Sequence, residues 1–300
     1  MKSFLTFLIL LALNARAADE PLNLFADAHE ITVQTAPTFQ EGETISFRVS
    51  FAHRTLASGT TRAGGGTPGS AGVPPAEGVT RLPVALPGMK PGVALPLELT
   101  LSRPDGTQSE TRKAWAFSDD PALLPAKKIV LFDRDEKTAD ALESLSIPFE
   151  RGNSSPLATV ETNTLILVGE DFSERETFNA ILGAAERGAD VLVLAPGRDT
   201  PLAVPKTIRH LRLGSAQEIL RNPKAVYELA LPEGGGLWLD AQDGAILLRA
   251  DEHAALQAAQ WNFTNGGRVR VCGASLIANW ETTPAARWLL AEMLNTGEQP

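Results

Sequence analysis

Cysteine, histidine and aromatic residues are scarce in this chain of 300 residues. The single cysteine, Cys272, cannot form an intrachain disulfide, so stability has to come from the packing of the core. The four histidines lack the three- or four-residue spacing that brings two metal ligands together on a helix, so no metal site is expected. Three consecutive glycines at 234–236 lack the lysine of a phosphate-binding loop, and the sequence predicts no cofactor.

Basic residues are also too few to give the chain a positive field. With 27 lysines and arginines against 36 aspartates and glutamates, the formal net charge is −9. Nucleic acids and anionic lipids require a basic surface, so nucleic acid is not expected among the partners. No apolar run reaches the length of about 20 residues that spans a bilayer, so stable membrane insertion is not expected either.

The first 17 residues have the pattern of a cleavable secretory signal peptide. A positively charged start precedes the apolar run 4–13, and the A-R-A sequence at 15–17 supplies the small residues of a cleavage site. The apolar run is too short to serve as a membrane span. We therefore expect residues 1–17 to be removed and the mature protein to be periplasmic or secreted.

Strand patterns dominate residues 22–120. In the sequence TISFRVSF at 44–51, every second residue from Ile45 to Phe51 is apolar, which is typical of a half-buried strand. The run 97–101 repeats this alternation, and a Pro-Asp-Gly turn after it leads into a return strand. Because no helical stripe accompanies these strands, we expect residues 22–120 to form an all-β, immunoglobulin-like sandwich.

A low-complexity insert interrupts this domain at residues 61–80. Its sequence, TRAGGGTPGSAGVPPAEGVT, is rich in glycine, proline, alanine and serine and has almost no core-forming residues. Because the entropy of loop closure grows slowly with loop length, a sandwich can carry such a segment between two strands. We interpret it as a neutral disordered insert, with a flexible interaction loop as the alternative.

Strands and helices alternate in the second domain, residues 126–296, which follows a turn cluster. Short apolar runs that are typical of parallel strands buried on both faces lie at 128–132, 164–168 and 190–194. Residues 138–146 have a helical stripe, and Ser173 with Glu176 predicts a capping box at the start of a second helix. This order of strands and helices predicts right-handed crossovers and a parallel sheet.

Four segments of this domain together resemble a known fold. The sequences KKIVLFD, TLILVGED, AAERGADVLVLAPG and GGRVRVCGASL follow one another before a terminal helix. Their order and spacing resemble the class I glutamine amidotransferase-like fold, of the non-catalytic type found in the trimerisation domain of family 42 β-galactosidases. The resemblance covers about half of the chain. It implies a flavodoxin-like α/β C-terminal domain and a role beside enzymes that degrade carbohydrates.

The position of the catalytic residue argues against amidotransferase activity. The resemblance implies that a nucleophilic cysteine would stand in the sharp turn after the strand 190–194, where Ala195 and Pro196 stand here. Neither side chain can attack a carbonyl, and proline lacks the backbone N–H that an oxyanion hole would use. Cys272 falls in an apolar strand, where a lone cysteine usually behaves as a small hydrophobic residue. The sequence therefore favours a protein that is not an enzyme.

Four residues are candidates for ligand binding. Asp133, Glu170 and Asp171 follow parallel strands, at the sheet edge where α/β domains bind ligands, and could accept hydrogen bonds from sugar hydroxyls. The alternative is that they are solvated loop residues and helix-capping acids. Trp280 lies in a loop between a strand and a helix and could contact a partner, whereas core packing is the alternative for a tryptophan.

Three functions remain open from the sequence. The first is an exported, non-enzymatic binding or assembly protein associated with carbohydrate degradation, with a carbohydrate or a protein as its partner. The second is a hydrolase that acts on a carbohydrate or ester through the carboxylates at the sheet edge. The third is a scaffold that forms a homo-oligomer through the α/β domain.

Overall fold

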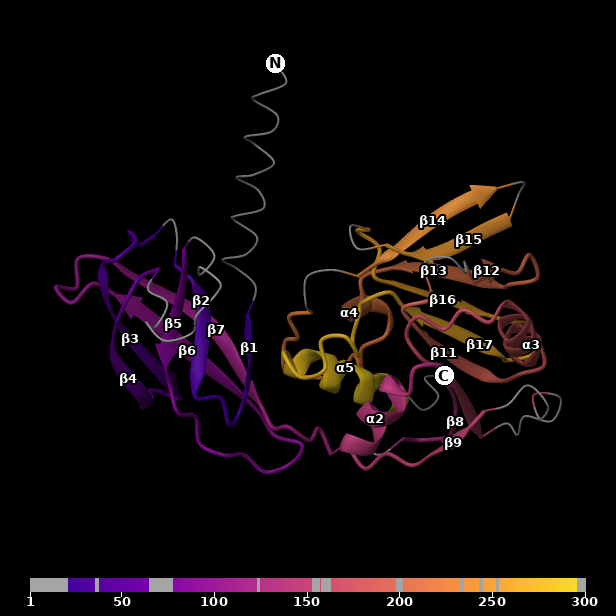
Figure 1. The fold of residues 1–300 in the computed structure, drawn as a ribbon, viewed down its shortest axis with the longest axis horizontal. Coiled ribbons are helices and arrows are strands. Elements are labelled where there is room, and N and C mark those ends of the chain that lie inside the picture. Colours follow the sequence, from indigo (N-terminus) through magenta and orange to yellow (C-terminus); the bar gives the residue numbers. More distant parts are fainter. Residues whose placement is uncertain are drawn as a thin grey trace, which may run out of the picture. The chain divides into compact units, whose positions relative to one another are not determined.

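The protein is a mixed α/β chain in which β-sheets predominate. The computed structural model describes residues 21–35, 38–64, 78–122, 125–152, 157, 163–197, 202–231, 235–242, 245–251 and 254–295 (Figure 1). The expected signal peptide and residues 65–77 of the insert lie outside these described residues. The predicted bounds of the insert, 61–80, are too wide, because strands occupy Arg54–Arg62 and Val79–Pro83. Among the residues that are described, we find no helix with the length and apolar character needed to cross a membrane.

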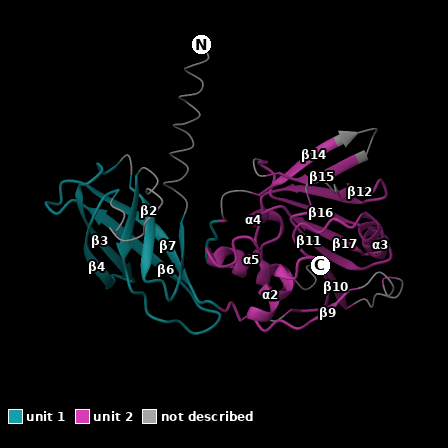
Figure 2. Ribbon diagram, in the orientation of Figure 1, with its two compact units in different colours: residues 1–119, 226–230 teal, residues 120–225, 231–300 magenta. Residues whose placement is uncertain are grey.

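The chain divides into two compact units (Figure 2). Unit 1 contains residues 1–119 together with 226–230, and unit 2 contains residues 120–225 and 231–300. The division after Asp119 falls within the turn cluster that separates the two sequence patterns. The short segment 226–230 was not anticipated as a part of the first unit.

Unit 1 consists of two β-sheets. The larger sheet has the order β1-β7-β6-β3-β4, in which only the pair β1–β7 is parallel, and the smaller sheet pairs β2 with β5. The strands are β1 (Leu22–Phe25), β2 (Glu30–Gln34), β3 (Thr44–Phe51), β4 (Arg54–Arg62), β5 (Val79–Pro83), β6 (Ala94–Ser102) and β7 (Ser109–Phe117). Buried apolar side chains from both sheets form one core.

The predicted alternation in residues 44–51 is correct up to Val49. Ile45, Phe47 and Val49 are buried in the core between the sheets. A register shift between Val49 and Ser50 then interrupts the pairing of β3 with β4, so that Ser50 is buried and Phe51 is exposed at the end of the hairpin. A bulge of this kind changes the face on which the following side chains lie, which the sequence pattern alone does not indicate.

The segment Val226–Ala230 packs on β1 and β7 of unit 1. The ring of Tyr227 stands edge-on to Trp115, with 6.3 Å between ring centroids, and to Phe117, with 5.6 Å. The backbone N–H of Ala230 donates to Oδ1 of Asn23 at 2.9 Å. These contacts explain why a segment that lies about 110 residues beyond β7 in the sequence belongs to the same unit.

Unit 2 is built on a seven-stranded sheet with the order β13-β16-β17-β11-β10-β8-β9. The strands β9, β8, β10, β11 and β17 are parallel, and β16 and β13 extend the sheet in antiparallel fashion. Their bounds are β8 (Lys128–Phe132), β9 (Phe149–Arg151), β10 (Thr164–Val168), β11 (Asp190–Leu194), β13 (His210–Gly214), β16 (Ala258–Asn262) and β17 (Arg268–Cys272). The three predicted parallel strands at 128–132, 164–168 and 190–194 are confirmed.

Two layers cover the seven-stranded sheet. One face packs against α3 (Arg175–Glu186) and against a three-stranded antiparallel sheet, β12-β15-β14, within one core cluster. That small sheet contains β12 (Leu202–Val204), β14 (Leu237–Gln242) and β15 (Ala245–Ala250). The other face carries α2 (Lys137–Ser144), α4 (Ala216–Ile219) and α5 (Pro284–Asn295) (Figure 1).

The predicted capping box at the start of α3 is wrong. The helix begins one residue later than the sequence pattern suggests, so its N-cap residue is Glu174, whose side chain makes no capping hydrogen bond. Ser173 instead accepts a hydrogen bond from Arg134 at 3.0 Å. A capping box does occur at the short helix α4, where Ser215 and Glu218 exchange hydrogen bonds with each other's backbone N–H groups.

Candidate functional site

Asp133 caps a helix. It follows β8, and its Oδ2 atom accepts a hydrogen bond from the backbone N–H of Ala139 at 2.9 Å, in the first turn of α2. The residue at the N-cap position, Glu136, has φ +61° and makes no side-chain cap, so Asp133 satisfies this helix end from outside. A Cβ at Gly169 would lie 2.7 Å from Asp133 Oδ1, which explains why glycine stands in this turn.

Glu170 holds the loop that follows β17. Its two carboxylate oxygens accept hydrogen bonds from the backbone N–H groups of Ile277 at 2.8 Å and Ala278 at 3.2 Å. Burial raises the pKa of Glu170 above its ordinary value, although the two backbone hydrogen bonds oppose that shift. The carboxylate therefore fastens the loop after β17 to the end of β10.

Asp171 lies next to Glu170 but differs from it in environment. Its side chain is exposed and its backbone has φ +58°, while its N–H donates to the carbonyl of Ala195 at 3.1 Å. The three predicted carboxylates thus share one sheet edge, as expected, but two of them are engaged by different backbone segments. Among the described residues, no group of three or more histidine, cysteine, aspartate and glutamate side chains could hold a metal ion.

Trp280 belongs to the core and does not form a binding surface. Only 6% of the residue is exposed, and its indole N–H donates to Oγ of Ser144 in α2 at 3.2 Å. The guanidinium of Arg287 lies 5.6 Å from the ring centroid and donates to the carbonyl of Trp280 at 2.9 Å. The prediction that Trp280 contacts a ligand is therefore corrected, because both the ring and its N–H are already occupied.

The turn after β11 is tightly held and carries no reactive group. Ala195 has φ +21° and is buried, and its N–H donates to the carbonyl of Cys272 at 2.6 Å. Its own carbonyl accepts from Asp171, so this turn is tied to the ends of both neighbouring strands. Pro196 follows and has no backbone N–H.

Cys272 lies in the middle of the sheet and is unsuited to act as a nucleophile. The residue is fully buried, and this burial raises the pKa of its thiol to about 12. The sulfur lies 3.8 Å from the carbonyl oxygen of Ala274, its hydrogen-bond acceptor. The interpretation of Cys272 as a small hydrophobic residue agrees with this environment.

A buried ionic cluster occupies the opposite edge of the sheet, which the sequence analysis did not single out. Asp190 accepts two hydrogen bonds from Arg268, at 3.1 and 2.6 Å, and also contacts Lys127 at 3.2 Å and Arg270 at 3.4 Å. Burial alone would raise the pKa of Asp190, but the three cations outweigh it and lower the pKa. Burial lowers the pKa of Arg270 to about 10.

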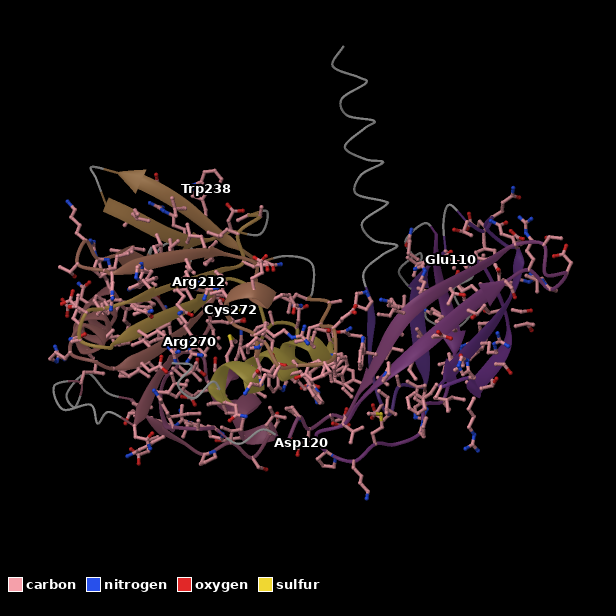
Figure 3. All side chains as sticks on the ribbon, turned by 180° about the vertical axis from the view of Figure 1, so that it is seen from behind. Glu110, Asp120, Arg212, Trp238, Arg270 and Cys272 are labelled. Carbon is pink, nitrogen blue, oxygen red and sulfur yellow. The ribbon has the colours of Figure 1, made fainter. Side chains whose placement is uncertain are left out.

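This cluster has a structural role. The other end of Arg270 donates to the carbonyl of Met293 at 2.8 Å, in the last turn of α5. Its guanidinium thus links Asp190, at the start of β11, to the C-terminal end of a helix, where a cation is favourable. Figure 3 shows Arg270 and Cys272 inside unit 2, on the strand β17.

The outer face of the small sheet β12-β15-β14 is the most distinctive surface that the structure describes. Five side chains that the structure describes lie on this face, which we call the Trp238 face: Ala203, Trp238, Asp240, Leu247 and Arg249. Trp238 is 57% exposed (Figure 3). The alternate residues, including Leu237, Leu239 and Leu248, contribute to the core beneath the sheet.

A sequence signal for Trp238 existed but was not used. Residues 237–240 read Leu-Trp-Leu-Asp, which is a period-two pattern with leucines on one face and Trp238 and Asp240 on the other. The three glycines before this run obscured the strand. Of the five tryptophans, Trp238 is the exposed one, whereas Trp261, Trp280 and Trp288 are buried and Trp115 is half-buried.

Comparison with known proteins does not assign the chain to a family. No protein-family model matches the sequence, and a search of the curated proteins finds no match. A functional assignment therefore has to come from the geometry of the residues described above.

Proposed function

We propose that the protein is an exported, non-enzymatic binding or assembly protein that takes part in carbohydrate degradation. The expected signal peptide at residues 1–17 supports export to the periplasm or beyond. The acidic net charge of −9 is compatible with an uncharged or cationic partner and unfavourable for nucleic acid.

The order of the parallel strands supports the resemblance to a non-catalytic amidotransferase-like domain. Numbered by their order in the chain, the five parallel strands lie in the order 2-1-3-4-5, which is the order in flavodoxin-like sheets. Two sheets around one core in unit 1 likewise support an immunoglobulin-like sandwich as the preceding domain. Fold does not determine function, so the proposal depends on the site.

The observation that carries the proposal is the chemistry of the turn after β11. A nucleophile there would need an ionisable or hydroxyl side chain, and Ala195 offers only a methyl group. Its N–H, which could have stabilised an oxyanion, already donates to the carbonyl of Cys272. The one thiol of the chain is buried, with its pKa raised to about 12.

Hydrolysis through the sheet-edge carboxylates has weaker support. A general acid or base must reach a proton of the substrate, and both oxygens of Glu170 accept backbone hydrogen bonds. Asp133 is likewise engaged at the start of α2. These contacts favour a structural role for the carboxylates over a catalytic one.

The proposal is tested with the mature protein, residues 18–300. We expect no release of ammonia from glutamine and no hydrolysis of nitrophenyl esters or glycosides, together with retardation of the protein in gels that contain a soluble polysaccharide. A Cys272→Ser variant serves as the matched control for trace activity. Turnover that disappears in this variant would refute the non-enzymatic assignment, and a protein that no polysaccharide retards would refute the link with carbohydrate.

A further inference from the structure

The strand β13 forms an edge of the seven-stranded sheet. It comes first in the strand order and pairs only with β16. At the end of β16, the N–H of Phe263 donates to the carbonyl of Gly267, on the side of β17. Since backbone groups point to alternate sides along a strand, the odd-numbered residues of β16 bond to β17. Their partners in β13, Leu211 and Leu213, therefore direct their N–H and C=O groups away from the sheet.

These outward backbone groups have no partner among the residues that the structure describes. The side chains of the strand are also accessible, because His210, Arg212 and Leu213 are exposed, Leu213 by 41%. An edge with unpaired N–H and C=O groups can accept an extended segment of another chain as an additional strand. The side chains of β13 then decide which segment fits.

Positive charge is concentrated at this edge. Lys206, Arg209 and Arg212 follow one another closely, and residues 200–217 contain no aspartate or glutamate, although the chain has 36 of these acids. All three cations are exposed, and none of them takes part in an ion pair among the described residues. The described part of the chain thus offers this edge no counter-ion of its own.

The two faces of β13 differ in chemistry. His210 and Arg212 lie on one face, beside neutral amide side chains of β16. Leu211 and Leu213 lie on the other face, where Leu211 packs against the core cluster and Leu213 is exposed. A strand paired with β13 would place each of its residues on the same face as the residue opposite. The edge therefore matches a strand that is acidic on one face and apolar on the other.

We propose that β13 binds an acidic segment of a partner protein as an added strand, with acidic and apolar residues alternating along that segment. Carboxylates would lie opposite His210 and Arg212, and an apolar side chain would cover Leu213. This inference goes beyond the proposed association with carbohydrate and does not depend on it.

A second copy of β13 is a poor occupant of this edge. Antiparallel pairing of two overlapping copies would place Arg212 opposite Arg212 or His210 of the other copy, and like charges directly opposite each other are destabilising. The net charge of −9 does not prevent an acidic segment from binding, because charges more than about 8 Å away are largely screened at physiological ionic strength. The cations of β13 would lie in direct contact with the carboxylates.

Fluorescence anisotropy with the mature protein and labelled synthetic peptides tests this proposal. The probe is a peptide in which glutamate and valine alternate. The comparison peptide has the same composition, arranged as one acidic and one apolar block. We expect the alternating peptide to bind at least about 10-fold more tightly, because only the alternation matches the two faces of β13.

Two variants separate the contribution of charge from that of the backbone. Arg212→Glu should weaken binding about 10-fold, since it replaces an attractive cross-strand pair by a repulsive one. Leu213→Pro removes an outward N–H and no bond to β16, so the sheet should form as before while binding falls by at least about 10-fold. The melting temperature checks that this variant is folded, and Arg212→Glu, a change at an exposed side chain, provides the test if it is not.

Arg48→Glu is the matched control. It makes the same change of charge at an exposed residue of β3 in unit 1 and should leave the affinity for the peptide unchanged. A loss as large as that of Arg212→Glu would show that only net charge matters, and would overturn the proposal.

Equal affinity for the two peptides, or binding that persists in folded Leu213→Pro, would overturn the addition of a strand. Polygalacturonate that binds where neither peptide does would replace the partner protein with an anionic polysaccharide. A wild-type protein that binds neither peptide would refute this inference and leave the proposed association with carbohydrate standing.

Discussion

Replacing Asp190 with asparagine should be strongly destabilising, because it removes the one negative charge among three cations. The side chain of Arg270 is only 3% exposed, so water cannot replace the lost carboxylate around its guanidinium. Removing one partner of a buried ion pair typically costs 3–5 kcal/mol, so we expect about that loss in the free energy of unfolding. For a unit of this size, the melting temperature should fall by roughly 6–20 °C.

The matched control is Glu150→Gln, which breaks an exposed ion pair in the same sheet. Lys128 Nζ and Glu150 Oε2 are 2.8 Å apart, but both side chains are more than half exposed, so the change should cost no more than about 1 kcal/mol. Calorimetry and urea unfolding of the mature protein measure both variants. An Asp190→Asn protein within about 1 kcal/mol of the wild type would refute the reasoning, since the cluster would then tolerate unpaired cations.

The contribution of Asp190 to the free energy of unfolding should also depend on pH. Because its pKa is lower in the folded state than in the unfolded chain, its contribution is fully present above the unfolded pKa of about 3.9. The contribution is lost as the pH falls through the lower, folded pKa. The wild type and Asp190→Asn should therefore converge in stability below that range, and curves that stay parallel down to pH 2 would contradict this assignment.

Two further predictions concern a thiol and a hairpin. The pKa of the Cys272 thiol is raised to about 12, so almost none of it is thiolate at pH 8. The folded protein should therefore not react with a disulfide reagent until guanidinium unfolds it. Rapid labelling of the native protein would contradict the buried position. Ala52 and His53 both have positive φ in the two-residue turn between β3 and β4, where the sequence Asn-Gly is preferred. The double change Ala52→Asn and His53→Gly should therefore stabilise unit 1 by about 1–2 kcal/mol, measured by thermal unfolding. A lower melting temperature would show that the turn is not strained.

Local patterns were sufficient to locate three of the parallel strands in unit 2. The runs 128–132, 164–168 and 190–194 are short and mostly apolar on both faces, and the structure places β8, β10 and β11 at those bounds. A second helix near Ser173 was also predicted, and α3 in that region contributes Phe178 and Ile181 to the core. Such features depend on neighbours within a few residues, which is the information that a single sequence contains.

The site residues could not be decided in this way. The placement of Trp280 depends on Ser144 and Arg287, and that of Glu170 depends on the N–H groups of Ile277 and Ala278, more than 100 residues along the chain. The local sequence around a tryptophan or a carboxylate in a loop does not indicate whether the side chain is exposed to solvent or contacts a distant backbone segment. These contacts form because the loop after β17 packs against the end of β10 and against α2.

The sequence alone shows that alanine and proline occupy positions 195 and 196. Neither side chain can act as a nucleophile, whatever the position of this turn in the fold. The exposure of Trp238 and the burial of Asp190 beside three cations are different in kind. Trp238 is exposed because the core takes Leu237 and Leu248 from one face of the small sheet and leaves the other face uncovered among the described residues. Asp190 is buried on the other face of the seven-stranded sheet, where Arg270 joins it to the end of α5. Burial depends on contacts between residues that are far apart in the sequence. Such packing decides that the indole of Trp238 is exposed and that the carboxylate of Asp190 is buried as the counter-ion of three cations.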